Sequence, residues 1–132
     1  MAGTVYAGVF LTRRVKLDEG EIVLRSANAF RYGRMGFFSA GILSMTAQRL
    51  IWTPIPYFWD IWPWIATRPD VLDVSLHRNT MIWLVWYPWQ KWAVQIQARK
   101  STYRFGFGAD WPLRDQRTNV DHWLGTIREW MN

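Results

Sequence analysis

The side chains that could carry out catalysis are few and scattered along this sequence. Its 132 residues include no cysteine and two histidines, His77 and His122, neither of which belongs to a recognisable metal-binding motif. Asp70 and Asp73 could act as paired carboxylates, but solvation at the start of a predicted strand explains both. The serines lack the strand–turn–helix context of a nucleophile. The sequence therefore predicts no catalytic residue, no metal site and no cofactor.

The most unusual feature of the sequence is its concentration of aromatic side chains. Tryptophan accounts for 11 residues, and several of them fall in the segment 55–69, a long connection between predicted strands. Tryptophan and tyrosine favour the membrane–water interface, because an apolar ring carries one polar N–H or O–H group. We predict contact with a membrane or a partner through residues of this loop and of the tryptophan-rich segment that follows it: Tyr57, Phe58, Trp59, Trp62, Trp64, Trp86 and Trp89.

The same aromatic surface admits other uses. Aromatic side chains are enriched in interfaces between protein subunits, and a loop of this kind could also fold back over the open end of a barrel. Binding of another protein, self-association and simple packing therefore stay open beside membrane contact. For the tryptophans of the segment 83–92, cover by the loop is the favoured explanation.

The chain carries a net charge of +6, from 16 lysines and arginines against 10 aspartates and glutamates. Arginine suits phosphate groups, because its guanidinium donates two parallel hydrogen bonds. The candidates for binding an anionic group are Arg25, Arg31, Arg34 and Arg68. Basic residues interleaved with aromatics also occur in nucleic-acid-binding proteins, but here the charge is dispersed and Arg104–Gly108 is out of phase with the RNA-recognition motif. Nucleic acid is therefore a distant alternative.

The elements that must position these side chains are mainly β-strands. Period-two alternation predicts seven of them, in the segments 21–31, 40–46, 49–53, 71–76, 81–87, 92–99 and 102–108. The period then changes, and one stripe of an amphipathic helix follows: Val120, Trp123, Leu124, Ile127 and Trp130. An antiparallel sheet of this size hides its edges in a barrel or a sandwich, and the helix can cap the open end. We expect a single domain over residues 1–132, with an N-terminal extension at 1–16 and an insertion loop at 55–69.

The order of several short motifs adds a family resemblance. Leu17–Ile22 precede the first long strand, and Gly41–Trp52 form a hairpin in which a threonine is followed by a basic-hydrophobic strand. Val71–Val74, Tyr103–Phe107 and Val120–Trp130 follow in sequence. In this order the motifs resemble the GRAM and bacterial branch of the pleckstrin-homology superfold, in which seven strands precede a capping helix. The resemblance implies a membrane-associated module that binds lipid or protein and has no catalysis of its own.

No apolar stretch of the sequence is long enough to predict a membrane-spanning helix, which needs about 18 residues. The apolar N-terminus also lacks the preceding basic region of a secretory signal. We therefore expect a cytoplasmic protein attached peripherally to the inner face of the membrane. Its expected partner is an anionic membrane surface or a protein, with homo-oligomerisation through the aromatic surface as an alternative.

Overall fold

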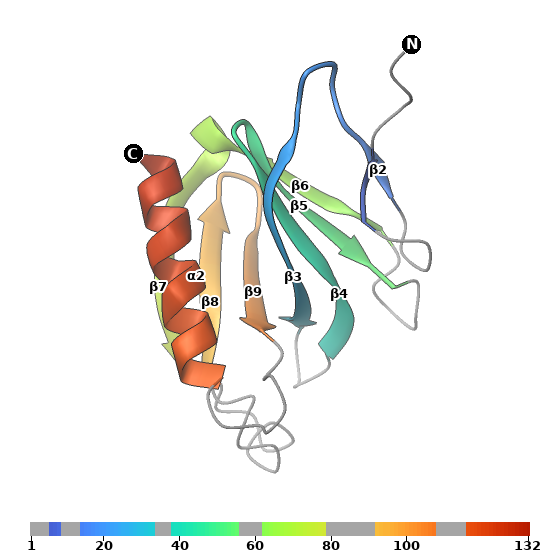
Figure 1. Cartoon of the computed structure of the whole chain (residues 1–132). Helices are drawn as coiled ribbons and strands as arrows, with labels where there is room; N and C mark the ends of the chain where they lie inside the picture. The colour runs from blue at the N-terminus through green and yellow to red at the C-terminus, as the bar shows by residue number, and fades with distance from the viewer. Residues whose placement is uncertain (1–5, 9–13, 34–37, 56–61, 79–91, 108–115) are drawn as a thin grey trace.

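The computed structural model describes residues 6–8, 14–33, 38–55, 62–78, 92–107 and 116–132 (Figure 1). The elements are, in chain order, β1 (Tyr6–Ala7), β2 (Val15–Lys16), β3 (Val23–Tyr32), β4 (Phe38–Thr46), β5 (Arg49–Pro54), β6 (Trp64–Thr67), a 3-10 helix (Arg68–Asp70), β7 (Val71–Arg78), β8 (Trp92–Ala98), β9 (Thr102–Phe107) and α2 (Gln116–Met131). Seven strands form one antiparallel sheet in the order β6-β5-β4-β3-β9-β8-β7, and β1 pairs with β2 separately. The predicted fold class, mainly β with one C-terminal helix, is confirmed.

The seven-stranded sheet is bent into a sandwich and does not close into a barrel. β6 and β7 are its two edges and are not paired with each other. The two halves of the sheet nevertheless face one another. The ring of Trp64 in β6 stacks on Tyr103 in β9 with centroids 4.3 Å apart, although β5, β4 and β3 lie between these strands in the sheet. Trp52 in β5 contacts Phe105 in β9 at a centroid distance of 5.2 Å. Of the two expected closures, the sandwich is the one that fits.

The helix α2 lies along β7, β8 and β9 and covers one side of the sandwich (Figure 1). The stripe predicted from the sequence is buried in full: Val120, Trp123, Leu124, Ile127 and Trp130. The Trp123 ring stacks on Phe107 with centroids 5.0 Å apart and planes 3° from parallel. A single apolar helix face thus completes the core that the open sheet leaves exposed.

Two parts of the chain differ from the sequence-based expectation. The segment 55–69 was expected to be a loop, but Trp64–Thr67 form the edge strand β6 and pair with β5. Four residues after Pro63 are too few to produce a clear alternating pattern. The expected N-terminal extension contains β1 and β2, which pair antiparallel through Tyr6 with Lys16 and Ala7 with Val15. The strand predicted at 81–87 lies outside the described residues.

A close approach between β4 and β5 makes a glycine necessary at position 41. A Cβ atom on Gly41 would lie 2.8 Å from Cα of Pro54 and 2.8 Å from Cη2 of Trp52, closer than carbon atoms pack. Pro54 is also the residue paired with Gly41, so its backbone cannot move aside without disturbing the ladder. We expect Gly41→Ala to lower the free energy of unfolding by about 1–3 kcal/mol, measured by urea denaturation.

The matched control is Gly125→Ala in α2, where an added Cβ would meet nothing within 4 Å. Because alanine is the better helix former, by up to about 1 kcal/mol, this control is expected to keep or raise the stability. Equal destabilisation of the two variants would contradict the steric explanation.

Candidate functional site

A buried ion pair joins the segment before β3 to the β4–β5 hairpin. Glu21 is only 6% exposed, and its carboxylate accepts hydrogen bonds from Nε (2.9 Å) and Nη2 (2.7 Å) of Arg49. The Thr46 hydroxyl and the Asp18 backbone N–H also donate to it, at 2.7 and 2.9 Å. These donors, Arg49 foremost, lower the pKa of Glu21 from 4.5 to about 2. Because all four donors favour the charged form, the carboxylate is ionised at physiological pH.

The ion pair connects the motifs that carry the family resemblance. Glu21 belongs to Leu17–Ile22, whereas Thr46 and Arg49 belong to the hairpin. Nη2 of Arg49 also donates to the carbonyl oxygen of Lys16 at 3.0 Å, and Nε1 of Trp130 donates to the carbonyl oxygen of Thr46 at 2.7 Å. The N-terminal segment, the hairpin and the last turn of α2 therefore meet at one point. Both carboxylate oxygens are occupied, so the pair has a positioning role.

The predicted aromatic contact residues differ in their exposure and contacts. Trp62 lies at the surface with 68% of its area exposed. Trp64 is half-buried, stacks on Tyr103, and donates from Nε1 to the Ser101 hydroxyl at 3.0 Å, which favours the packing explanation for this residue. The others lie outside the described residues: Tyr57, Phe58, Trp59, Trp86 and Trp89.

Two exposed isoleucines accompany Trp62. Ile55 follows the end of β5 and Trp62 precedes the start of β6, so both lie at the same end of the β5–β6 pair, whereas Ile65 lies within β6 opposite Ile51. Ile55 is 39% and Ile65 43% exposed. We call this group (Ile55, Trp62 and Ile65) the Trp62 surface. Exposed apolar side chains on one pair of strands are a candidate contact site. The two isoleucines were missed in the sequence, because the pairing of β6 with β5 is what turns Ile65 outward.

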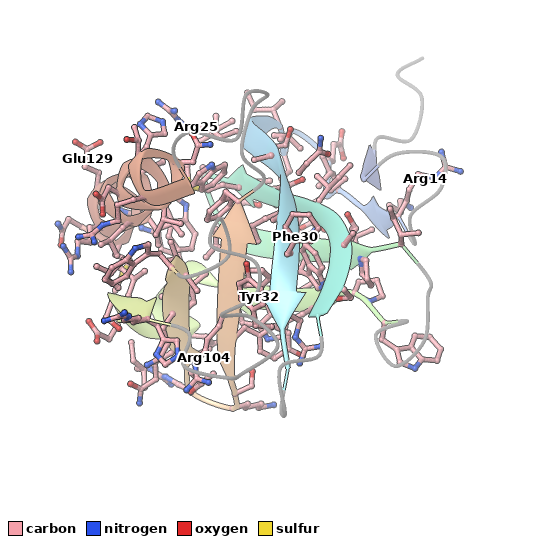
Figure 2. The ribbon with its side chains drawn as sticks, turned by 90° about the horizontal axis from the view of Figure 1, so that it is seen from below. Arg14, Arg25, Phe30, Tyr32, Arg104 and Glu129 are labelled. Carbon is pink, nitrogen blue, oxygen red and sulfur yellow. The ribbon has the colours of Figure 1, made fainter. Side chains whose placement is uncertain are left out.

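Two basic side chains flank Val15: Arg14, directly before β2, and Lys16, in β2. Val15 of β2 packs against the cluster that contains Ile51, and Ile51 is paired in register with Ile65. Arg14 and Lys16 flank Val15 in sequence and are exposed. Figure 2 shows Arg14 on the side of the molecule opposite Arg25 and α2. We call Arg14 and Lys16 the β2 basic pair; Val15, between them, packs against the cluster of Ile51, the residue paired with Ile65 of the Trp62 surface.

The arginines predicted to bind an anionic group are not brought together. Arg25 is exposed and donates from Nη1 to Nε2 of His122 at 3.0 Å. Arg31 is about 20 Å further along β3, at about 3.3 Å per residue, and its guanidinium carbon lies 3.8 Å from the centroid of the Tyr103 ring. Arg68 is exposed and donates to the carbonyl oxygen of Asn132 at 2.7 Å.

The three described arginines therefore lie in separate surroundings. Arg25 lies against α2, Arg68 lies beside the residue that follows α2, and Arg31 lies over the Tyr103 ring. Arg34 lies outside the described residues. A phosphate group could not be held by more than one of the three described arginines in this arrangement, because a bidentate or clustered site requires donors within a few ångströms of each other.

Comparison with known proteins bears on the fold. No protein-family model and no curated protein matches the chain. Among solved structures, the C-terminal domain of an unknown protein from Leishmania infantum is similar, with a TM-score of 0.55, 14% sequence identity, and coverage of 86% of this chain and 88% of that one. At this identity the likeness concerns the fold alone.

The described part of the chain contains neither a membrane-spanning helix nor a group of metal ligands. No helix in this part of the chain is long and apolar enough to cross a membrane. Nor do three histidine, aspartate or glutamate side chains gather there in a way that could hold a metal ion. Among the exposed features of the described residues are the Trp62 surface and the β2 basic pair.

Proposed function

We propose that the chain is a non-catalytic module of the pleckstrin-homology and GRAM type that attaches peripherally to anionic membranes through the Trp62 surface. The observation that carries the proposal is the 68% exposure of Trp62, together with the exposure of Ile55 and Ile65 on the same pair of strands. An indole ring is amphipathic and is well suited to the lipid headgroup region. The proposed location is the cytoplasmic face of the membrane, where anionic lipids attract basic side chains.

The family part of the proposal is supported by the order of the elements. A seven-stranded antiparallel sheet followed by a helix is what the resemblance implies. The Glu21–Arg49 pair also gives a physical reason for two of the resembling motifs to occur together, since each supplies one partner of a buried salt bridge.

The β2 basic pair supplies the electrostatic part of the interaction. Each basic residue close to an anionic leaflet contributes about 1 kcal/mol. Arg14 and Lys16 are exposed and flank Val15, which packs against the cluster of Ile51, the partner of Ile65, so in the proposed orientation a bilayer facing Ile65 meets these charges as well. Replacing both with alanine would therefore weaken binding about 30-fold at low salt, and less at high salt, because salt screens exposed charges.

The edge strand limits how deeply this surface can enter the bilayer. β6 is an edge strand of the sheet, and in the described part of the chain no strand pairs with its outer side. Unpaired backbone N–H and C=O groups cannot enter the hydrocarbon region without a large loss of free energy. The proposed contact is therefore shallow, with Trp62 and Ile65 in the headgroup region and the β6 backbone in water.

We predict that Trp62→Ser weakens binding to vesicles of equal parts phosphatidylcholine and phosphatidylserine by about tenfold or more, because the apolar contact of the indole is lost. Co-sedimentation measures the binding, and a blue shift of tryptophan emission on adding vesicles reports the change in environment. Leu72→Ser is the matched control, since Leu72 is 53% exposed on β7, at the opposite edge of the sheet. It is expected to bind as the wild type does.

Other outcomes distinguish the alternatives. No co-sedimentation of the wild type at low salt would refute the membrane proposal. A molecular mass that rises with protein concentration and falls in Trp62→Ser would instead support self-association through the same surface. Salt-sensitive binding to arbitrary oligonucleotides would support the nucleic-acid alternative.

A further inference from the structure

The short hairpin of β1 and β2 is not part of the seven-stranded sheet. Each of its strands has two residues, and among the described strands they pair with each other alone. Figure 1 shows β2 on the side of the main sheet that lies away from α2. An isolated pair of strands is marginally stable at best in water, and these strands are shorter than most. The position of the hairpin therefore depends on the contacts that attach it to the rest of the chain.

One attachment of the hairpin is apolar. Ala7 of β1 and Leu17, directly after β2, are buried with Ile51 of β5 in one small cluster, against which Val15 packs. Ile51 is paired in register with Ile65 of the Trp62 surface. Because the hydrophobic effect is not directional, these contacts hold the hairpin against β5 but do not by themselves orient its backbone.

The second attachment is polar and directional. Arg49 of β5, whose side chain is 14% exposed, donates from Nη2 to the carbonyl oxygen of Lys16 at 3.0 Å. The same guanidinium donates to both carboxylate oxygens of Glu21, from Nε at 2.9 Å and from Nη2 at 2.7 Å. Glu21 also accepts a hydrogen bond from the backbone N–H of Asp18. The backbone on both sides of the buried Leu17 is thus fixed by one ion pair.

This set of hydrogen bonds requires an arginine. The guanidinium is planar and presents five N–H donors in a fixed fork, so Nη2 can donate one hydrogen to the carboxylate and the other to a carbonyl oxygen. A lysine would keep the charge at position 49, but its one nitrogen is a compact group that does not match this fork. Arg49 therefore combines two tasks, which are to neutralise Glu21 and to hold the backbone of β2.

We propose that Arg49 is a positioning residue for membrane attachment: through the Lys16 carbonyl it fixes β2, and so places the charges of the β2 basic pair for contact with anionic lipid headgroups. This inference rests on the proposed function, to which it adds a residue that does not itself touch the lipid. The side chains of Arg14 and Lys16 are exposed, whereas the guanidinium that holds their strand is mostly buried. Fixing the strand in advance lowers the entropy cost of binding.

The test compares Arg49→Lys with the wild type in the whole chain. Hydrogen exchange of the backbone amides of residues 15–17, followed by NMR, reports how firmly β2 is held without any lipid present. Loss of the hydrogen bond to Lys16 is expected to speed this exchange about tenfold. Co-sedimentation with vesicles of equal parts phosphatidylcholine and phosphatidylserine is expected to show about fivefold weaker binding at low salt. The difference is expected to shrink at high salt, because salt screens exposed charges.

Two further variants separate positioning from stability. Leu17→Ala loosens the same hairpin from its apolar side while leaving Arg49 and both charges in place, and it is expected to weaken vesicle binding by a similar factor. Val74→Ala removes buried methyl groups from β7, at the opposite edge of the sheet from β6, and lowers the stability of the fold. It is expected to change neither the exchange at residues 15–17 nor vesicle binding. Circular dichroism checks that all three variants are folded.

The proposal is overturned if Arg49→Lys leaves the exchange at residues 15–17 unchanged, since Arg49 then does not hold β2. It is also overturned if the exchange becomes faster while vesicle binding stays as tight as in the wild type, or if Val74→Ala weakens binding to the same extent. The proposed function survives these outcomes as long as Trp62→Ser weakens binding. Absence of vesicle binding by the wild type would instead refute the proposed function, and the membrane role of Arg49 with it.

Discussion

Arg49→Met is expected to lower the free energy of unfolding by about 3–5 kcal/mol, the usual cost of removing one partner of a buried ion pair. The methionine side chain fills much of the same volume, but it leaves the Glu21 carboxylate without the two hydrogen bonds and the positive charge that Arg49 supplies. The Thr46 hydroxyl and the Asp18 N–H are its remaining partners among the contacts described above. Urea denaturation followed by far-ultraviolet circular dichroism at neutral pH measures the loss.

The same ion pair predicts a sensitivity to acid. The pKa of Glu21 is about 2 in the folded chain, against an ordinary value of 4.5 that describes the unfolded chain. As the pH falls, the unfolded state therefore takes up the proton first. The stabilisation is fully present above about pH 4.5 and is lost progressively between pH 4.5 and pH 2. Its full size is about 3.5 kcal/mol, at about 1.4 kcal/mol for each unit of pKa.

Two comparisons separate this explanation from a general effect of removing charge. Arg104→Met removes an exposed guanidinium that makes one hydrogen bond to Gln95, and is expected to change stability by less than about 1 kcal/mol. In Arg49→Met the loss of stability between pH 4.5 and 2 is expected to be smaller than in the wild type, because the main cause of the low Glu21 pKa is gone. An unchanged acid dependence in this variant would show that the pair does not govern it.

Most strands and the helix of this fold are predictable from local patterns, whereas the way in which the two halves of the sheet pack against each other is not. Alternation located β3, β4, β5, β7, β8 and β9, because each of these strands is long enough to repeat the pattern. The apolar stripe of α2 was equally clear, since a spacing of three and four residues fits a helix and no strand. β6 was not predicted because it is short and because its inward ring, Trp64, packs against Tyr103 and Phe105, which lie far along the chain.

The candidate sites show the same division between local and distant information. The abundance of aromatic residues pointed to the segment around Trp62, and the structure exposes that side chain. No local pattern could indicate that Glu21 pairs with a residue 28 positions later, or that Trp130 reaches back to Thr46 across 84 positions. The basic residues near one another in sequence, Arg25 and Arg31, lie far apart along one strand and meet different partners.

Trp130→Ala is expected to lower the free energy of unfolding by about 3–5 kcal/mol, which is typical of truncating a buried aromatic side chain. Trp130 is 8% exposed and belongs to the core cluster, so its removal leaves a cavity under the last turn of α2. Trp130→Phe keeps most of the packing but leaves the carbonyl oxygen of Thr46 without the indole donor. The expected cost is about 1–2 kcal/mol. Urea denaturation gives both values, and Glu129→Ala on the exposed side of the helix is the control, expected within about 0.5 kcal/mol of the wild type.

The decisive measurement is the combination of Trp130→Phe with Arg49→Met. Both side chains tie the β4–β5 hairpin to other parts of the chain: Arg49, in the hairpin, shares the Glu21 carboxylate with the Thr46 hydroxyl, and Trp130 of α2 donates to the Thr46 carbonyl oxygen. Residues within one hydrogen-bond network generally show interaction energies of about 0.5–3 kcal/mol in a double-mutant cycle. We therefore expect the double variant to lose less free energy of unfolding than the sum of the losses in the two single variants. Once one change has weakened the contacts of the hairpin, the other change removes an interaction that already contributes less. Strict additivity would mean that the helix and the ion pair hold the hairpin independently, and that position 46 is not the point through which they act together.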